Sequence, residues 1–565
     1  MNRGLLGAIA ALFLGACTAQ VAPPTLAAQR ATVEVQILAF NDFHGNLETP
    51  DPVEVTEADG AKHKVLTGGA AHLAAALGRL RAGHANTITV SAGDTIGASP
   101  LVSANYLDEP TIDAMNLLNL EFDSVGNHEF DRGANELKRM QAGGCAKFTR
   151  RVPCSLEPFG GARFRYLAAN VVQADGTTIF PATALKRFNT PAGPIVIGFI
   201  GETLRGTQNL VTPAGVRGLT FKDEADSANA LVPQLKAAGA NAIVLLIHQG
   251  GKTPQFTVGN TCEGLTGEIL PIVQRLDPAI TTIISGHTHW AYICNGAPSI
   301  GASRLLTSAG KYGYFLTDLR LEFDPWTHRL VGQDAHNIVV GNGERGTDSA
   351  EQALVARYAA AVAPFAQRII GHLTAPAPNA QDNGESPASD LIADSMLAAT
   401  RASELGGAQL ALVNASGVRV PLRSGDIKYS DAFQMMPFGN NLVVMTLTGA
   451  QLKAVIEQQY RLALPPPHQR PHALATSAGF TYAVEMSKPA GSRVSDVRLA
   501  GKLIEPDERY RVVVNNYLAS GGDGLTAFTV GTDISDKNII DLDALVAWIS
   551  AGQTPPTPSR IRIIG

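Results

Sequence analysis

Seven side chains of metal-ligand type occur in five short clusters within the first part of the chain. They are Asp42, His44, Asp94, Asn127, His248, His287 and His289. Carboxylate oxygens combined with imidazole nitrogens suit zinc, manganese or iron better than calcium. Seven such groups exceed what one tetrahedral ion needs, whereas two ions about 3.5–4 Å apart would use them all. The residue types therefore indicate two divalent metal ions (zinc, manganese, iron or cobalt) and metal-centred hydrolysis.

A histidine beside the third cluster can assist the leaving group of such a reaction. His128 precedes Asp131 by three residues, so one helical turn would let the carboxylate orient the imidazole. An imidazole held in this way can stabilise the reacting oxygens and help an alcohol to depart. Helix capping is the alternative, because Asn127 and Asp131 are both cap-type residues. We favour the catalytic interpretation, which makes His128 and Asp131 a candidate catalytic pair.

Each cluster lies at or just after an apolar run that is typical of a β-strand. The runs are Val35–Phe40, Thr87–Val90, Ser124–Val125, Ala242–Ile247 and Thr281–Ile284. Open α/β sheets carry their chemistry at the carboxyl ends of strands, so ligands from successive strands converge on one point. The strands alternate with helix-like runs at Gly69–Ala82, Thr111–Leu118 and Asp223–Ala238. This alternation predicts βαβ units in a layered α/β domain.

The chain has 565 residues, which is too long for one core and suggests roughly two to four domains. An Ala-rich helical stretch from about Asp348 to Ile369 separates two different sequence textures. We predict a metal domain over residues 33–345, a connector helix over 346–369 and a smaller mixed α/β domain over 370–565. The last domain is expected to contain helices at Asp390–Leu405 and Thr448–Tyr460 and strands at Gln409–Val413, Leu442–Leu447 and Tyr510–Asn515.

The N-terminus has the pattern of an export signal. Arg3 precedes the short apolar run Leu5–Leu14, and Leu14-Gly15-Ala16-Cys17 has the form of a lipobox. An ordinary signal peptide that ends at a small residue such as Ala19 is the alternative. We favour a lipoprotein, with a signal peptide over residues 1–16 and a lipidated Cys17 and tether over residues 17–32.

Composition limits the partners of the chain. Hydrophobic residues make up 45% and charged residues 17%, which is normal for a globular protein. The net charge of −5 gives no support for a nucleic-acid surface, although single nucleotides remain possible substrates. We expect a monomer attached to a membrane through the lipid on Cys17. Thr18 stands where an Asp would favour inner-membrane retention, so the outer membrane, facing the periplasm or the cell surface, is favoured.

If the chain is exported, its remaining cysteines are expected to form disulfides. Cys145, Cys154, Cys262 and Cys294 are an even set, which suggests two disulfides in an oxidising compartment. Four cysteines allow three connectivities. We favour Cys145–Cys154 and Cys262–Cys294, because each pair closes a polar, Gly-containing excursion. A zinc site is the weaker alternative, because the chain has no C-x-x-C pair.

Several of these motifs carry a family resemblance. Asp42-x-His44, Gly93-Asp94, Gly126-Asn127-His128-Glu129, His248 and Gly286-His287-x-His289 resemble the signature of the calcineurin-like metallophosphoesterases. The longer string from Gly126 to Gly133 resembles a narrower family of 5′-nucleotidases, UDP-sugar hydrolases and 2′,3′-cyclic nucleotide phosphodiesterases. The resemblance covers essentially the whole mature chain. It implies a four-layer β-sandwich flanked by helices, linked by a helix to a smaller mixed α/β domain that binds substrate.

The resemblance also implies roles for the candidate ligands. One metal would take Asp42, His44, Asp94 and His289, and the other would take Asp94, Asn127, His248 and His287. Asp94 would be shared, and His128 with Asp131 would assist departure of the leaving group.

The second domain contains three clusters that are suited to holding a nucleotide: Asn414–Arg419, Pro437–Asn440 and the Gly-rich loop Tyr517–Gly524. Two aromatic residues, Phe438 and Tyr517, can sandwich a base at about 1–3 kcal/mol per stacking contact. Arg419 can bind phosphate, and Asp523 can accept hydrogen bonds from ribose. Taken singly, the aromatics could equally be core residues and the Gly-rich loop an ordinary turn. By resemblance to the family's C-terminal domain, the substrate-binding set is Asn414, Gly417, Arg419, Phe438, Tyr517 and Asp523.

One segment departs from the family pattern. Relatives that favour nucleoside monophosphates carry arginines just before the first helix of the second domain, whereas this chain has Gln381-Asp382-Asn383-Gly384-Glu385-Ser386. No Lys or Arg occurs from His372 to Thr400. Strict monophosphate specificity is therefore in doubt.

Together these patterns predict an extracytoplasmic hydrolase that releases phosphate from nucleotides by attack of a hydroxide held between two metals. A 2′,3′-cyclic nucleotide phosphodiesterase or a UDP-sugar hydrolase on the same scaffold is the alternative. A thiosulfohydrolase of sulfur oxidation is less favoured because of the base-stacking aromatics, and a non-catalytic nucleotide-binding lipoprotein because the ligand set is complete.

Overall fold

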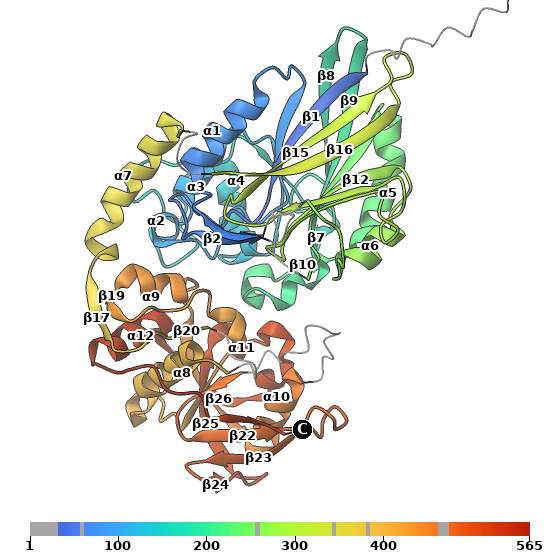
Figure 1. Cartoon of the computed structure of the whole chain (residues 1–565). Coiled ribbons are helices and arrows are strands. Elements are labelled where there is room, and N and C mark those ends of the chain that lie inside the picture. The colour runs from blue at the N-terminus through green and yellow to red at the C-terminus, as the bar shows by residue number, and fades with distance from the viewer. Residues whose placement is uncertain are drawn as a thin grey trace, which may run out of the picture.

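The chain folds into two domains that lie end to end in the computed structural model (Figure 1). The structure describes residues 32–56, 61–254, 260–341, 346–379, 385–460 and 474–564. The predicted signal peptide, Cys17 and the tether up to residue 31 lie outside this range. Within the described ranges, no helix has both the length and the hydrophobicity needed to cross a bilayer.

The N-terminal domain contains two six-stranded sheets packed face to face. The first has the order β16 (Leu330–Val339), β15 (Phe315–Phe323), β1 (Val33–Phe40), β4 (Thr87–Ser91), β5 (Phe122–Ser124) and β6 (Arg165–Leu167). The second has the order β13 (Ala291–Asn295), β14 (Leu305–Ala309), β12 (Ile280–Ser285), β11 (Ala242–His248), β9 (Gly193–Thr203) and β8 (Thr183–Thr190). β1, β4 and β5 are parallel, as are β9, β11 and β12, so their carboxyl ends share one edge of the sandwich.

Alternating residues build the core between the two sheets. Val35, Ile37 and Ala39 of β1 point to the second sheet and are fully buried there. They meet the Ile197 and Val244 side chains of β9 and β11 in one apolar cluster. Successive side chains of a strand point to opposite faces of the sheet, so every second residue of β1 faces the other sheet.

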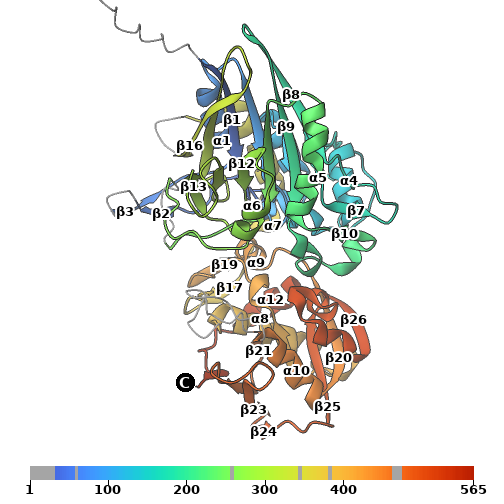
Figure 2. The ribbon, with the colours of Figure 1, turned by 90° about the vertical axis from the view of Figure 1, so that its right-hand side faces the viewer.

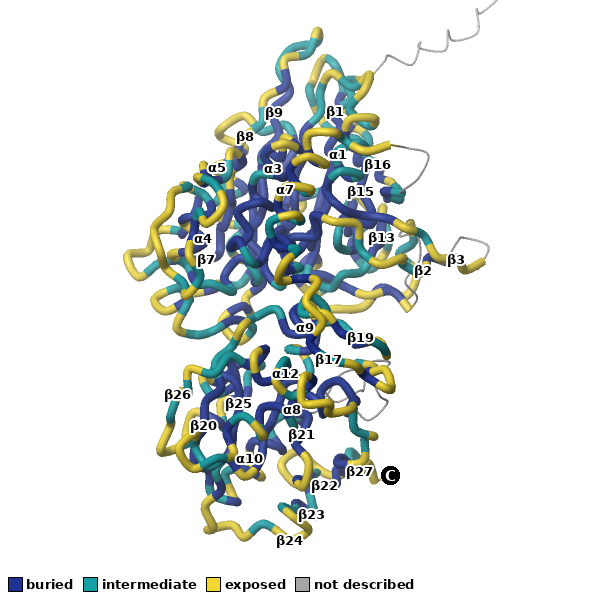
Figure 3. Tube along the Cα trace, turned by 90° about the vertical axis from the view of Figure 1, so that its left-hand side faces the viewer, coloured by how far each residue is buried: buried dark blue, intermediate teal, exposed yellow. Residues whose placement is uncertain are grey.

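Helices cover the outer faces of the sandwich and complete four layers. α1 (Ala70–Arg81), α2 (Leu101–Ala104), α3 (Glu109–Leu117) and α4 (Ala134–Ala142) share one apolar cluster with the outer side of the first sheet. α5 (Glu224–Ala237) and α6 (Ile269–Arg275) cover the second sheet. The expected four-layer α/β sandwich is therefore confirmed, and buried segments run through its strands in Figure 3. The remaining elements are β2 (Val53–Thr56), β3 (Lys62–Val65), β7 (Val171–Gln173), β10 (Leu219–Phe221) and the 3₁₀ turns η1 (His128–Phe130), η2 (Arg205–Asn209) and η3 (Pro213–Val216).

The connector is the helix α7 (Ser349–Ala366), which runs beside both domains in Figure 1. The Asp348 side chain caps it by accepting hydrogen bonds from the N–H groups of Ala350 and Glu351. The helix ends three residues before the predicted boundary at Ile369, because Ile369 begins the strand β17 (Ile369–Leu373) and pairs there with Lys428. α7 packs on α1, α2 and α3 of the first domain and on α9 (Tyr429–Met435) of the second.

The C-terminal domain is built on a five-stranded mixed sheet, seen below the first domain in Figure 2. Its order is β21 (Ala475–Thr476), β18 (Leu410–Val413), β25 (Arg509–Asn515), β20 (Asn441–Thr448) and β26 (Thr532–Ile540). A second sheet has the order β24 (Lys502–Leu503), β23 (Val494–Leu499), β22 (Phe480–Val484) and β27 (Ile561–Ile563). The other elements are β17 (Ile369–Leu373), α8 (Pro387–Thr400), η4 (Ser403–Leu405), η5 (Ala415–Gly417), β19 (Gly425–Lys428), α9 (Tyr429–Met435), α10 (Gly449–Gln459), α11 (Asn516–Ala519), η6 (Gly522–Gly524), η7 (Thr526–Val530) and α12 (Asp541–Ser550).

The first helix of this domain differs from the prediction of Asp390–Leu405. α8 begins at Pro387, because the Ser386 and Ser389 side chains form a capping box and proline is favourable in the first turn. It ends at Thr400, and a separate 3₁₀ turn covers Ser403–Leu405.

The four cysteines of the described chain form two disulfides. Cys145 is bonded to Cys154, with 5.5 Å between the Cα atoms. Cys262 is bonded to Cys294, with 4.9 Å between the Cα atoms. These are the two pairs that the sequence favours, and no cysteine among them is left for a zinc site.

Candidate functional site

The seven candidate metal ligands meet at the shared edge where parallel strands of both sheets end. Asp42 and His44 follow β1, Asp94 follows β4 and Asn127 follows β5. His248 is the last residue of β11, and His287 and His289 follow β12. The side chains are buried or half-buried. Residues that are far apart in the sequence therefore converge, as expected for the carboxyl ends of strands.

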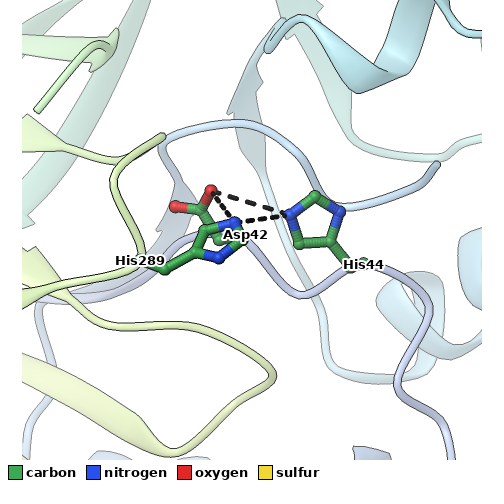
Figure 4. A group of neighbouring side chains, drawn as sticks. All are labelled: Asp42, His44 and His289. Atoms are coloured by element: carbon green, nitrogen blue, oxygen red, sulfur yellow. Dashed lines mark hydrogen bonds and ion pairs between the residues drawn. The ribbon is translucent and has the colours of Figure 1, made fainter. Parts of the chain in front are cut away.

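The first group of ligands comprises Asp42, His44 and His289, drawn in Figure 4. The Oδ1 atom of Asp42 lies 3.8 Å from Nε2 of His44 and 3.4 Å from Nε2 of His289. The two imidazole Nε2 atoms are 3.1 Å apart. Three potential ligand atoms thus face one small space, which is the arrangement that a single cation requires.

The second group comprises Asp94, His248 and His287, and Asp94 also reaches the first group. The Oδ2 atom of Asp94 lies 2.9 Å from Nε2 of His248 and 3.7 Å from Nε2 of His44. One carboxylate oxygen therefore stands between both groups. The other oxygen, Oδ1, accepts a hydrogen bond of 2.8 Å from the backbone N–H of His128.

Five of the seven candidate ligands have a strained backbone. Asp42, His44, Asp94, His287 and His289 all have positive φ, between 49° and 72°. Residues other than glycine rarely adopt this conformation, which costs of order 1–3 kcal/mol each and clusters at functional sites. The left-handed backbone turns these side chains in directions that regular strand geometry does not allow. Such strained residues cluster at functional sites, so their presence here supports a functional role.

Hydrogen bonds fix the orientation of the imidazoles and of one carboxylate. Nδ1 of His44 lies 2.9 Å from the Gly97 carbonyl oxygen, and Nδ1 of His248 lies 2.8 Å from the Ala92 carbonyl oxygen. Each ring donates its Nδ1 proton to that carbonyl, so its Nε2 lone pair points into the site. The Oδ2 atom of Asp42 accepts hydrogen bonds from the Asn41 amide and from the His287 N–H.

The donor set fits divalent cations. The Oδ1 atom of Asn127 is buried and has no hydrogen-bond partner among the described residues, so a cation would satisfy it. Burial alone would lower the pKa of His248, but the Asp94 and Asp42 carboxylates raise it to about 10 in the metal-free protein, and a bound divalent cation would offset the same carboxylates while the imidazole is neutral. Burial and the charge on His248 lower the pKa of His287 to about 4, which keeps its imidazole neutral, as a metal ligand must be.

Glu129 is not among the predicted site residues, yet its carboxylate holds together two loops that carry candidate metal ligands. Its oxygens accept hydrogen bonds from the backbone N–H groups of Asp94 (2.9 Å), Thr95 (2.8 Å), Ile96 (3.2 Å) and Gly126 (2.7 Å). The four donors belong to the loops after β4 and β5. The only signal in the sequence was the position of Glu129 within the string after Gly126.

We expect Glu129→Gln to weaken metal binding by about 10- to 100-fold, as loss of a supporting partner does elsewhere. The amide has one acceptor oxygen, so some of the four N–H groups lose their partner and Asp94 loses its fixed position. Metal titration of the purified variant measures the effect, with the exposed Glu263→Gln as the matched control. Metal affinity equal to that of the wild type would show that Glu129 does not position Asp94.

His128 and Asp131 form the predicted pair. Nδ1 of His128 lies 2.8 Å from Oδ2 of Asp131, and the imidazole packs edge-to-face on His44 at 5.0 Å between ring centroids. Burial disfavours the charged ring, but the Asp131 and Asp94 carboxylates outweigh it and raise the pKa of His128. The capping alternative fails, because the Asn127 side chain makes no capping hydrogen bond at the start of η1.

All six predicted substrate-binding residues line one cavity together with metal-site residues. The cavity has a volume of about 700 Å³ and lies between the two domains. Asn127, His128 and His287 line it from the first domain, and Asn414, Gly417, Arg419, Phe438, Tyr517 and Asp523 line it from the second. This volume falls within the range of small-molecule sites.

We call the six predicted substrate-binding residues the candidate nucleotide clamp, and its two aromatic residues have different partners. Phe438 stacks on His128, with ring centroids 5.9 Å apart and an angle of 10° between the planes. The Arg419 guanidinium lies 5.8 Å from the centroid of the same ring. Phe438 therefore joins the candidate catalytic histidine to the candidate phosphate-binding arginine.

Tyr517 is largely buried, with 9% of its surface exposed, and its ring belongs to an apolar core cluster of the second domain, while its hydroxyl makes the polar contacts. The hydroxyl oxygen lies 2.7 Å from Oδ1 of Asp523 and 2.8 Å from the carbonyl oxygen of Asn209 in the first domain, so its proton can be donated to either. The hydroxyl also accepts a hydrogen bond from the N–H of Asp523. The side-chain amide of Asn414 is held by Ser416 and Asn515. Tyr517 thus links the clamp to the metal domain, a contact that a phenylalanine could not make.

The segment that departs from the family pattern is only partly described, because residues 380–384 lie outside the described ranges. The Glu385 carboxylate accepts hydrogen bonds from the N–H groups of Ser559, Arg560 and Ile561. Glu385 therefore holds the strand β27 in place and does not face the cavity.

Comparison with known proteins places both halves of the chain in one group. The family model described as "5′-nucleotidase, C-terminal domain" matches residues 369–530. Endonuclease YhcR of Bacillus subtilis is 29% identical over 93% of this chain, which spans 40% of the length of that relative. Cell wall protein Lmo0130 of Listeria monocytogenes is 30% identical over 92% of this chain and 67% of its own length. The crystal structure of a 5′-nucleotidase precursor from Thermus thermophilus matches with a TM-score of 0.73 and 26% identity, over 94% of this chain and 99% of that one.

Proposed function

Because the chain belongs to the 5′-nucleotidase family, we propose that it is a metal-dependent phosphoester hydrolase that releases phosphate from nucleotides. One observation carries the proposal. The Oδ2 atom of Asp94 stands between two ligand groups, and the cavity that reaches these groups is also lined by the nucleotide clamp. Metal chemistry and substrate recognition are thus provided at one place.

Different residues of the chain have different roles in the proposed reaction. When two divalent ions are bound, they lower the pKa of water towards neutrality and offset the negative charge of the phosphate. His128, held by Asp131, protonates or hydrogen-bonds the oxygen that leaves with the nucleoside. Arg419 binds phosphate oxygens by charge-assisted hydrogen bonds. Phe438 and Tyr517 hold the base at the wall of the interdomain cavity.

We also propose that the enzyme works outside the cytoplasm, anchored through a lipid on Cys17. The two disulfides support this location, because such bonds persist in oxidising compartments. The lipid would leave both domains free in the periplasm or at the cell surface.

The test is a substrate panel on the purified protein, with chromatographic separation of the products and assays of released phosphate and sulfate as the readouts. We expect release from nucleoside 5′-monophosphates, and the panel includes 2′,3′-cyclic nucleotides, UDP-sugars, a thiosulfate-derived conjugate and, because one relative is named an endonuclease, a short oligonucleotide. Hydrolysis of UDP-sugars or cyclic nucleotides alone would shift the assignment within the family. Tight nucleotide binding without any product over hours would contradict the proposed activity.

A further inference from the structure

The disulfide Cys145–Cys154 closes a loop whose tip enters the interdomain cavity. Phe148, Thr149, Arg150 and Arg151 of this loop all line the same cavity as His128 and Phe438. Neither the metal ligands nor the nucleotide clamp depends on these four residues. Their presence on the wall of the cavity needs its own explanation.

The base of this disulfide loop is firmly held. The N–H of Cys154 donates to both carboxylate oxygens of Glu109, at 3.0 and 3.1 Å. Arg139 donates to the same carboxylate at 2.7 Å and to the carbonyl oxygen of Gly144 at 2.8 Å. The loop is therefore anchored at its base, while Phe148 at its tip is 50% exposed.

The two arginines of the loop have only neutral partners. Arg150 donates to the side-chain oxygen of Asn538 in the second domain at 2.9 Å. Arg151 donates to the side-chain oxygen of Asn105 at 2.9 Å, and its guanidinium lies 5.9 Å from the ring centroid of Phe433. In the described parts of the chain, neither guanidinium has a carboxylate within ion-pair distance. Two cationic groups at the cavity wall thus form no ion pair among the described residues, although the Asp108 and Asp543 carboxylates raise the pKa of Arg151 from further away.

A third arginine lies beside this pair. Arg132 also lines the cavity, and its own charge is balanced by the buried carboxylate of Asp108. Burial and the charge of Arg132 lower the pKa of Arg151. An anion bound here would relieve the repulsion, and planar guanidinium groups match the geometry of phosphate oxygens.

We propose that Arg150 and Arg151 form an anion subsite for a second phosphate group of the substrate, separate from the phosphate held at the metal ligands. The proposal rests on the proposed function, because it assumes that a nucleotide occupies the cavity. It also supplies cationic groups in place of those absent from residues 372–400 of the opposite domain, where no Lys or Arg occurs. The favoured substrates are nucleotides that carry phosphate at two positions.

The experiment compares a nucleoside 3′,5′-bisphosphate with the matching nucleoside 5′-monophosphate. The ratio of their kcat/KM values is measured for the wild type, for Arg150→Gln/Arg151→Gln and for Lys147→Gln. Lys147 is an exposed cation of the same loop that does not line the cavity, so it is the matched control. We expect the double variant to lower the bisphosphate-to-monophosphate ratio by about tenfold, mainly through KM, and Lys147→Gln to leave the ratio unchanged.

An unchanged ratio would overturn the subsite. An equal loss for both substrates would also overturn it, because the arginines would then only stabilise the contact between the two domains. Calorimetric binding of the bisphosphate keeps the two proposals distinguishable. If the wild type releases no phosphate from either compound, the proposed function fails, whereas the subsite still requires about tenfold weaker bisphosphate binding in the double variant. Equal binding by both proteins would reject the subsite on its own.

Discussion

Replacement of Asp94 by asparagine is expected to lower phosphate release by at least about 10³-fold, because loss of several kcal/mol of charge stabilisation corresponds to that factor. Its Oδ2 atom lies 2.9 Å from His248 and 3.7 Å from His44, so one charge serves both ligand groups. The amide has nearly the same shape but no charge. Both ligand groups therefore lose the negative charge that they share, whereas the backbone conformation is expected to stay the same.

The measurement is kcat/KM for a nucleoside 5′-monophosphate at saturating metal, together with the metal content of the variant. Asp334→Asn removes a carboxylate from an exposed strand position and is the matched control. A variant of Asp94 that retains wild-type activity and two bound metal ions would contradict its shared position in the site.

Replacement of His128 by asparagine is the second change with a large expected effect. General acid–base groups contribute about 10²- to 10⁴-fold, and we expect a loss of kcat within this range. The imidazole sits between His44 and Phe438 and is held by Asp131 at 2.8 Å. The metal ligands remain in place, so metal binding should not change.

The nature of the leaving group separates catalysis from structure in this variant. We expect His128→Asn to lose much less activity on 4-nitrophenyl phosphate, whose leaving group needs little protonation, than on a nucleotide. Asp131→Asn should show the same pattern more weakly, and the double variant should be no worse than His128→Asn alone, since the two residues act as a unit. Equal losses on both substrates would show that the pair has only a structural role.

Much of the metal site could be predicted because its residues follow strand-like runs. Parallel strands bring their carboxyl ends to one edge, and so Asp42, Asp94, His248 and His287 could be placed together without a structure. The left-handed backbone of Asp42, Asp94 and His287 could not be predicted, because local preference disfavours it and tertiary contacts impose it. Glu129 was overlooked for a related reason, since its four partners are backbone N–H groups that leave no sequence pattern.

The interface between the domains was the hardest part to predict. The stacking of Phe438 on His128 joins residues more than three hundred positions apart, and the contact of the Tyr517 hydroxyl with Asn209 depends on how the domains meet. The pairing of Cys145 with Cys154 was predicted, but the direction in which its loop points was not. Helix ends also differed, as at Pro387, where a capping box set the start of α8.

The most direct test of the two-metal account is activity measured against metal content. The protein is stripped with a chelator, and manganese or zinc is returned stepwise while phosphate release from a nucleoside 5′-monophosphate and bound metal per chain are both recorded. The account predicts that stripping abolishes release and that full activity returns only as the second ion binds. Full activity in the stripped protein, or full activity with a single ion per chain, would contradict it.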